Sequence, residues 1–299
     1  MFRRASTLAV CACALSTVLS AGGVERPSIA VDQVLARVAG AVERYYARAQ
    51  SLICRESVRL QSLGADLLSD MSASRQLDYD LRVEWDPATD GDAPEANVLR
   101  QLVKVNGRAP RPKDEPGCMD PRAVSPEPLS MFLPKGQREY VFTVAGPAKI
   151  DSRAAWMLDY RSREVGPINV TWKKECFSIE MPGRTRGRAW IDAETGDVLR
   201  LDEHLTGMVD VTLPKEHRVV GGANFVVVER LDSSVRYRPV TFDDPAEVLM
   251  LPATITTVTV VRNSGVPRLR TEQVFSRYQR FLTGGGRTES FYRSGPRLA

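Results

Sequence analysis

The residues best suited to acid–base chemistry in this sequence are two histidines, His204 and His217, each preceded by a glutamate. Such a pair can hold and move a proton when both side chains face one nucleophile. Neighbouring residues of a strand point to opposite faces, so a Glu–His dipeptide within a strand cannot converge in this way. The sequence has no G-x-S-x-G, no H-E-x-x-H and no Cys/His cluster at metal-ligand spacing. We therefore expect no catalytic residue, no metal and no cofactor.

A second group of side chains suits the binding of an apolar ligand. Between residues 76 and 85 polar and apolar residues alternate strictly, which predicts an antiparallel strand with one dry and one wet face. Burial of an acyl chain against such a face stabilises a complex by about 0.8 kcal/mol per methylene group. With aromatic residues of other expected strands, the candidate ligand-binding residues are Leu77, Tyr79, Leu81, Val83, Trp85, Trp156, Trp190 and Phe275. The alternative interpretation is that these residues are ordinary core.

One helix and about eleven strands must position these side chains. Apolar residues recur every three or four positions between 31 and 50, which predicts a helix with one apolar face. From about residue 53 onward the period changes to two, and turn signals separate the runs. The expected fold class is therefore mainly β with one N-terminal helix. The strands form a curved antiparallel sheet of about eleven strands, a half-barrel wrapped around the helix and loops.

The first residues have the order of a secretory signal peptide. Arg3 and Arg4 precede an uncharged stretch that closes on small residues near Ala21. We expect a signal peptide over 1–21, a single β domain over 22–282 and a disordered tail over 283–299. The protein is then periplasmic or secreted, with an uncleaved membrane anchor as the alternative reading of the first segment.

The cysteines agree with an oxidising compartment. Two of the five fall in the expected signal peptide, which leaves Cys54, Cys118 and Cys176. One disulfide and one thiol is the simplest arrangement of three cysteines. Cys118 lies in a long Pro-rich loop over 108–127 and Cys176 begins a strand, whereas Cys54 suits a small buried position. We expect a Cys118–Cys176 disulfide, worth about 4 kcal/mol on the chain-entropy model, with three thiols as the alternative.

The charge balance argues against nucleic acid as a partner. The chain has 41 basic and 37 acidic residues. Arg3 and Arg4 belong to the expected signal peptide, so 39 basic and 37 acidic residues remain in the exported chain. A nearly neutral balance provides no general attraction to a polyanion.

The stretch GRAWIDAETGDVLRLD, residues 187–202, predicts a hairpin around the turn ETGD. Its pattern of an aromatic residue, an apolar residue, Asp, then Thr-Gly and an apolar return strand resembles the periplasmic lipoprotein-localisation superfamily of LolA, LolB and RseB-like half-barrels. The final strand, FSRYQRF, also resembles the closing strand of that family. The resemblance implies a curved antiparallel sheet around helices and a role in carrying acyl chains, binding lipids or sensing envelope stress through a protein. The loop 108–127 and the expected disulfide depart from a lipoprotein chaperone, so we expect a distant member.

The function expected from these features is non-enzymatic binding of a hydrophobic small molecule or lipid in the concavity of the half-barrel. The first alternative is a regulatory or assembly module that binds another envelope protein through a sheet face or edge. A peripheral contact with a membrane stays open. An enzyme is the weakest alternative, because it needs ionisable side chains that converge in a cleft, and His204, Glu203, Asp202 and Arg200 are the first place to look.

Overall fold

The computed structural model describes residues 29–49, 51–86, 94–114, 117–121, 128–173, 176–215, 223–265 and 268–280. The expected signal peptide at 1–21, the expected tail at 283–299, and the pair Glu216 and His217 lie outside the described residues.

Helix α1 comes first among the described elements, and the short helical elements η1 and α2 separate β3 from β4. All the other described elements are strands. The first half of the chain contains α1 (Val31–Arg48), β1 (Ser51–Leu63), β2 (Ser69–Asp86), β3 (Glu95–Val105), the 3-10 turn η1 (Leu129–Phe132), α2 (Pro134–Gln137), β4 (Tyr140–Ile150) and β5 (Arg153–Ser162). The second half contains β6 (Asn169–Lys173), β7 (Cys176–Glu180), β8 (Thr185–Asp192), β9 (Val198–Leu205), β10 (Val209–Thr212), β11 (Phe225–Asp243), β12 (Ala246–Arg262) and β13 (Arg268–Arg280).

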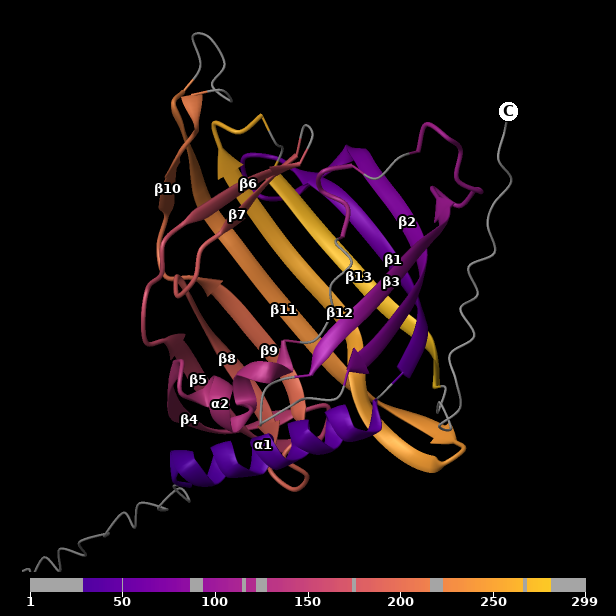
Figure 1. The fold of residues 1–299 in the computed structure, drawn as a ribbon, viewed down its shortest axis with the longest axis vertical. Helices are drawn as coiled ribbons and strands as arrows, with labels where there is room; N and C mark the ends of the chain where they lie inside the picture. The colour runs from indigo at the N-terminus through magenta and orange to yellow at the C-terminus, as the bar shows by residue number, and fades with distance from the viewer. Residues whose placement is uncertain are drawn as a thin grey trace, which may run out of the picture.

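Eleven of the strands form one antiparallel sheet, in the order β3-β2-β1-β13-β12-β11-β9-β8-β5-β4, with β10 paired to β11. The sheet is open, because β3 and β4 are its two edges. Strands β6 and β7 form a separate hairpin. Figure 1 shows the sheet curving around α1 at one end and the β6–β7 hairpin lying over the other end. The predicted fold class, a curved antiparallel sheet of about eleven strands with one N-terminal helix, is confirmed.

Helix α1 begins at Val31 and ends at Arg48, two residues short of the predicted end. Its apolar stripe packs against the concave face of the sheet in the largest apolar cluster, which we call the helix cluster. Central members from the two sides are Val34, Val38, Val42, Leu81, Leu201, Leu251 and Phe275. The helix is thus the main filling of one end of the half-barrel.

The turn of the β8–β9 hairpin fixes the position of α1. Arg37 Nη1 donates to the carbonyl of Ala193 at 2.8 Å, and Arg44 Nη2 donates to that of Thr195 at 3.1 Å. Gly196 has φ of +79°, and a Cβ there would lie 2.7 Å from the Arg37 carbonyl oxygen. Only glycine permits both the left-handed backbone and this approach. The Thr-Gly pattern seen in the sequence is therefore the docking point of the helix.

Two smaller apolar clusters lie away from α1. The β1–β3 cluster consists of Val58, Leu60, Leu77, Tyr79, Val105 and Leu269, with Met119 packed against it. The hairpin cluster joins the β6–β7 hairpin to β9, β10 and β11, through residues that include Trp172, Leu205, Val211 and Val226. The concave face therefore has three apolar regions rather than one continuous core.

Candidate functional site: the concave face of the sheet

The predicted binding residues of β2 all point to the concave side but divide between two clusters. Leu77 and Tyr79 belong to the β1–β3 cluster, whereas Leu81 and Val83 belong to the helix cluster with Phe275. All five of these side chains are buried. The dry face was thus predicted correctly, but part of it is covered by α1.

The predicted tryptophans separate. Trp85 and Trp156 are partly buried against the helix cluster. The Trp85 ring meets that of Tyr46 on α1 edge-on, with centroids 4.9 Å apart. Trp190 lies on the opposite, outer face, because its neighbours Ala189 and Ile191 occupy the helix cluster and alternate residues of a strand point to opposite sides. The prediction that Trp190 lines the concavity is therefore wrong.

The hollows that the described residues form beneath α1 are small. The hollows there have volumes of about 50 and 20 Å³ and are lined by residues such as Ala41, Tyr45 and Met250. Pockets for small-molecule ligands usually measure roughly 300–1,000 Å³. The helix end of the concave face is consequently packed as protein core in this structure.

Beyond α1 the concave face changes from apolar to polar between two neighbouring rows of paired residues. One row of paired residues across the sheet is mostly apolar and buried: Leu158, Ala189, Leu201, Val235, Ile255, Gln273, Val58 and Leu77. The next row, two residues farther along each strand, has four adjacent polar residues that are only partly buried: Glu203, Ser233, Thr257 and Thr271. We call these four residues the polar row. It crosses the middle of the sheet, from β9 to β13.

One end of the polar row meets a buried tyrosine. Gly187 lies between Tyr160 and Glu203 in the register, and a Cβ on it would come 2.3 Å from the Tyr160 hydroxyl. The absent side chain lets the Tyr160 hydroxyl reach a Glu203 carboxylate oxygen at 3.3 Å and the Asp202 carbonyl at 3.2 Å. Burial raises the pKa of Glu203 above its ordinary value, although the Tyr160 hydroxyl acts against that shift. Burial also raises the pKa of Tyr160, and nearby Glu203 adds to it.

A buried ion pair lies at the other side of the concave face. Arg100 Nε donates to Glu56 at 2.6 Å, and Gln273 Nε2 donates to the same carboxylate at 2.7 Å. The Arg100 guanidinium also lies 5.7 Å from the ring centroid of Tyr79, whose pKa is raised to about 12, chiefly by burial. Arg100 Nη1 has no hydrogen-bond partner among the described residues. Both carboxylate oxygens of Glu56 therefore accept hydrogen bonds, whereas the Arg100 guanidinium uses only some of its donors.

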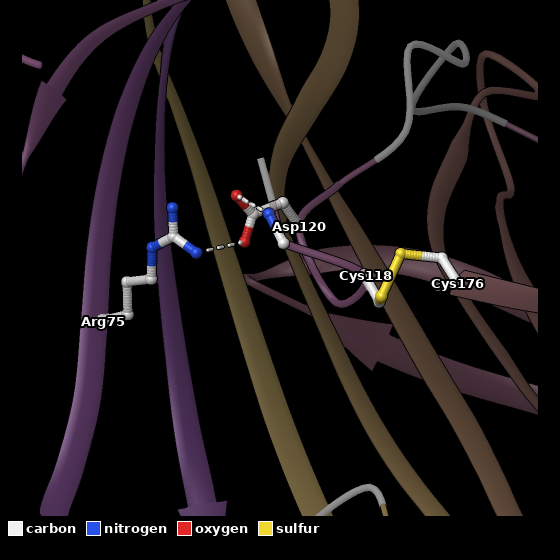
Figure 2. The surroundings of a disulfide bond; sticks show 5 residues. Arg75, Cys118, Asp120 and Cys176 are labelled. Atoms are coloured by element: carbon white, nitrogen blue, oxygen red, sulfur yellow. Dashed lines mark hydrogen bonds and ion pairs between the residues drawn. A yellow bond between two sulfur atoms is a disulfide. The ribbon is translucent and has the colours of Figure 1, made fainter. Parts of the chain in front are cut away.

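A covalently tied segment crosses the open side of the half-barrel. The predicted Cys118–Cys176 disulfide is present and joins the segment after β3 to strand β7. Two residues farther on, Asp120 forms an ion pair with Arg75 of β2 at 3.2 Å (Figure 2). Burial raises the pKa of Asp120, and Arg75 opposes that shift. We call residues 117–121 the strap, because they connect the β2 side of the sheet to the β6–β7 hairpin. Cys54 is buried and outside the disulfide, as predicted.

The sequence reasoning missed the charged residues of the concave face. Glu56 occupies an inward position of β1, between the buried Cys54 and Val58. A glutamate among the apolar residues that occupy every second position of a strand is a sequence signal of a buried, paired charge. Glu203 was considered only as part of a possible catalytic group with His204, Asp202 and Arg200. The Glu203 and His204 side chains lie on opposite faces, as the alternation requires.

His204, Asp202 and Arg200 share the outer face. Asp202 is engaged by Arg200, with Nε–Oδ1 at 2.7 Å, and by the Ser234 hydroxyl at 2.7 Å. Among the described residues no group of three or more His, Cys, Asp or Glu side chains is placed to hold a metal ion. Within the same residues, none of the helices combines the length and apolar character needed to cross a membrane.

The chain is similar to several solved structures at low sequence identity. No family model and no curated protein matches the chain. Similar solved structures include an outer membrane lipoprotein-sorting protein domain from Vibrio parahaemolyticus, with 12% identity, TM-score 0.40, and coverage of 84% of this chain and 94% of that chain. A LolA superfamily protein from Nitrosomonas europaea has 10% identity, TM-score 0.32, and coverage of 85% and 96%. A DUF1329 family protein from Desulfovibrio piger has 9% identity, TM-score 0.41, and coverage of 86% and 95%.

One of these structures carries the name of the LolA superfamily. Their TM-scores all lie below 0.5.

Proposed function

We propose that this protein is an exported, non-enzymatic binding protein that holds an amphipathic lipid on the concave face of its half-barrel, beyond α1. The observation that carries the proposal is the polar row, which is only partly buried although it lies in the middle of the inward-facing side of the sheet. A side of a sheet that faced only core would be apolar and buried at this position, as most residues of the preceding row are.

The surroundings of the polar row suit a molecule with a polar and an apolar part. Hydroxyl groups of Ser233, Thr257 and Thr271 can donate to or accept from a head group. Apolar surface lies on both sides, in the β1–β3 cluster and the hairpin cluster. Partly buried Leu231 faces the same side as Ser233, one step farther from α1. An acyl chain on these surfaces would gain about 0.8 kcal/mol per buried methylene group.

The strap gives such a site a cover. It packs Met119 on the β1–β3 cluster and is joined by the disulfide to the hairpin that covers the opposite cluster. Disulfides persist in oxidising compartments, which agrees with export to the periplasm or the medium. Of the residues predicted from the sequence, Leu77 and Tyr79 belong to the β1–β3 cluster beside this proposed site. Leu81, Val83 and Phe275 belong to the helix cluster, and Trp85 and Trp156 pack against it.

Two adjacent threonines of β12 provide a matched test. Thr257 belongs to the polar row, whereas Thr256 points to the outer face, and both are partly buried. The protein is purified without detergent, its mass is measured under native conditions, and lipid is extracted from the same sample. We expect a lipid-sized adduct on the wild type and on Thr256→Trp. Thr257→Trp should lose the adduct, because the indole fills the concave side.

Circular dichroism and thermal unfolding establish that both variants fold. A wild-type mass without adduct, unchanged after incubation with a lipid mixture, would overturn the lipid proposal. So would equal adducts on both tryptophan variants, because the lipid would then lie elsewhere.

The open edge of the sheet favours a second candidate, a module that binds another envelope protein. Among the described strands β3 pairs only with β2, and its Leu99 is 62% exposed. An edge strand of eleven residues without proline presents unpaired backbone groups to an incoming strand. A photo-reactive residue at position 99 should then crosslink one protein in cells, whereas the same residue at the exposed position Arg59 of β1 should not. The absence of a crosslink specific to position 99 would contradict this candidate.

A further inference from the structure

The outer face of the sheet has a hollow that the proposed lipid site does not use. It has a volume of about 490 Å³ and lies over β4, β5, β8 and β9. Five of its eleven lining residues are charged, and the lining includes Arg161, Arg186, Arg188, Trp190, Asp202 and His204. The size falls in the range of about 300–1,000 Å³ that is usual for small-molecule sites.

The strand register aligns like charges across this hollow. Arg161 of β5 pairs with Arg186 of β8, and Arg186 pairs with His204 of β9. Directly opposite side chains of neighbouring antiparallel strands approach to about 5 Å, and like charges there destabilise the sheet. Arg161 and Arg186 have no ion pair to any described residue. Two arginines at directly paired positions of β5 and β8 therefore have no counter-charge among the described residues.

The next row shows that the carboxylates of the hollow are already engaged. Arg188 contacts Asp159 with two hydrogen bonds, at 2.5 and 2.9 Å. Arg200 contacts Asp202 through Nε at 2.7 Å and through Nη2 at 2.6 Å. Four arginines thus face two aspartates, and the two unmatched positive charges are those of Arg161 and Arg186.

Trp190 supplies the apolar wall of the hollow. Its ring is partly buried, and the Arg200 guanidinium lies 4.7 Å from the ring centroid. This contact orients the indole beside the charged rows. The residue that was expected to line the lipid cavity instead belongs to a polar site on the other side of the same sheet.

We propose that this hollow is an anion-binding site for a phosphate-type group, held between Arg161 and Arg186 with His204 beside it. Guanidinium groups match the oxygens of phosphate in a bidentate geometry, and an anion between them removes their mutual repulsion. The phosphate could belong to a free small molecule or to a lipid head group, since the recognising chemistry is the same.

The test uses inorganic pyrophosphate as a soluble probe and vesicles of phosphatidylglycerol, with phosphatidylcholine vesicles for comparison. Binding of pyrophosphate is measured by calorimetry at low ionic strength, and vesicle binding by co-sedimentation. Arg161→Gln with Arg186→Gln should weaken binding by about tenfold or more, because charge-assisted hydrogen bonds are lost. The control pair is Arg59→Gln with Lys104→Gln, two exposed cations on the outer face of β1 and β3. It removes the same charge and should leave binding within about twofold of the wild type.

The two arms distinguish the source of the phosphate. A soluble ligand gives pyrophosphate binding without sedimentation, whereas a head-group site gives sedimentation that depends on Arg161 and Arg186. Absence of both kinds of binding in the wild type would overturn the proposal, and so would equal losses in the two variant pairs. If the double variant fails to fold, Arg186→Gln alone carries the same test.

Discussion

Glu56 and Arg100 on the concave face form an ion pair much like the one that Asp159 and Arg188 form on the outer face. Each arginine offers two nitrogens to one carboxylate, with nearest approaches of 2.6 and 2.5 Å. The surroundings differ: side-chain exposure is 0% and 5% for Glu56 and Arg100, against 44% and 39% for Asp159 and Arg188. The geometry of an ion pair alone therefore does not determine how much the pair contributes to stability.

The difference follows from the cost of removing charges from water. A buried pair must be complete, since a charge left alone in the core loses its solvation without compensation. An exposed pair can exchange its partner for water or for a ligand at little cost. We infer that the concave face uses charge to fix structure and that the outer face keeps charge available for binding.

The largest expected effect comes from breaking the inner pair. Glu56→Leu or Arg100→Met alone should lower the free energy of unfolding by about 3–5 kcal/mol, because each leaves the other charge buried. The double variant should regain most of that stability, since no charge then remains there. Urea unfolding of the three variants at one pH measures the contrast. Single variants within about 1 kcal/mol of the wild type would show that water reaches this part of the concave face.

The second expected effect concerns the cover of the concave face. Cys118→Ser with Cys176→Ser should lower the free energy of unfolding by about 2–4 kcal/mol, because the residues are 58 positions apart and the disulfide limits the unfolded chain. Reduction of the wild type should give the same loss. Binding of pyrophosphate by the folded double variant should be unchanged, because the hollow lies on the other face. A loss of that binding would show that the two faces are coupled.

The fold was predictable because its signals are local. Alternation along 76–85 identified the dry face of β2, and the spacing of apolar residues identified α1. The disulfide was expected from the small number of cysteines left outside the expected signal peptide. The distribution of Leu77 and Leu81 between two clusters was not predictable, since it depends on where α1 docks on the finished sheet.

The sites were less predictable, because they arise from the register of strands that are distant in sequence. The polar row exists only once β9, β11, β12 and β13 are aligned. The side of the sheet on which Trp190 lies was predictable, because the alternation of its neighbours in β8 indicates it. It shares a parity with Arg186 and Arg188, whereas Ala189 and Ile191 share the other, so the wet face was its consistent place.

A third prediction compares two carboxylates of the β8–β9 hairpin. Burial acts to raise the pKa of Asp192, but the N–H groups of Thr195 and Glu194 and the charge of Arg153 outweigh it, and the pKa lies below its ordinary value. The ionised form therefore stabilises the fold above the ordinary pKa of about 3.9, and this contribution is lost as the pH falls through the lower folded value. Asp192→Asn should lower the free energy of unfolding by about 2 kcal/mol at pH 7, and the difference from the wild type should become smaller in acid.

Glu203 should behave in the opposite way. Its pKa is raised by burial, so its stabilising contribution is complete below its ordinary pKa and is lost as the pH rises through the raised value. Glu203→Gln should consequently raise the free energy of unfolding by up to about 1 kcal/mol at pH 7 and leave it unchanged below about pH 4. Urea unfolding of both variants at pH 7 and pH 4 makes the comparison. Effects of the same sign for both variants at pH 7 would contradict the raised pKa of Glu203.

The smallest expected effect tests the outer pair itself. Asp159→Asn, Arg188→Gln and the double variant form a cycle whose coupling should be about 0.2–1 kcal/mol, because both side chains are exposed. Added salt should reduce that coupling further by screening the charges. The same salt should hardly affect the Glu56–Arg100 cycle, since buried pairs are screened much less. A coupling at the outer pair near that of the inner pair would mean that the hollow is as dry as the core. The unmatched charges of Arg161 and Arg186 would then be too costly to hold without a bound anion, and the protein should retain one through purification.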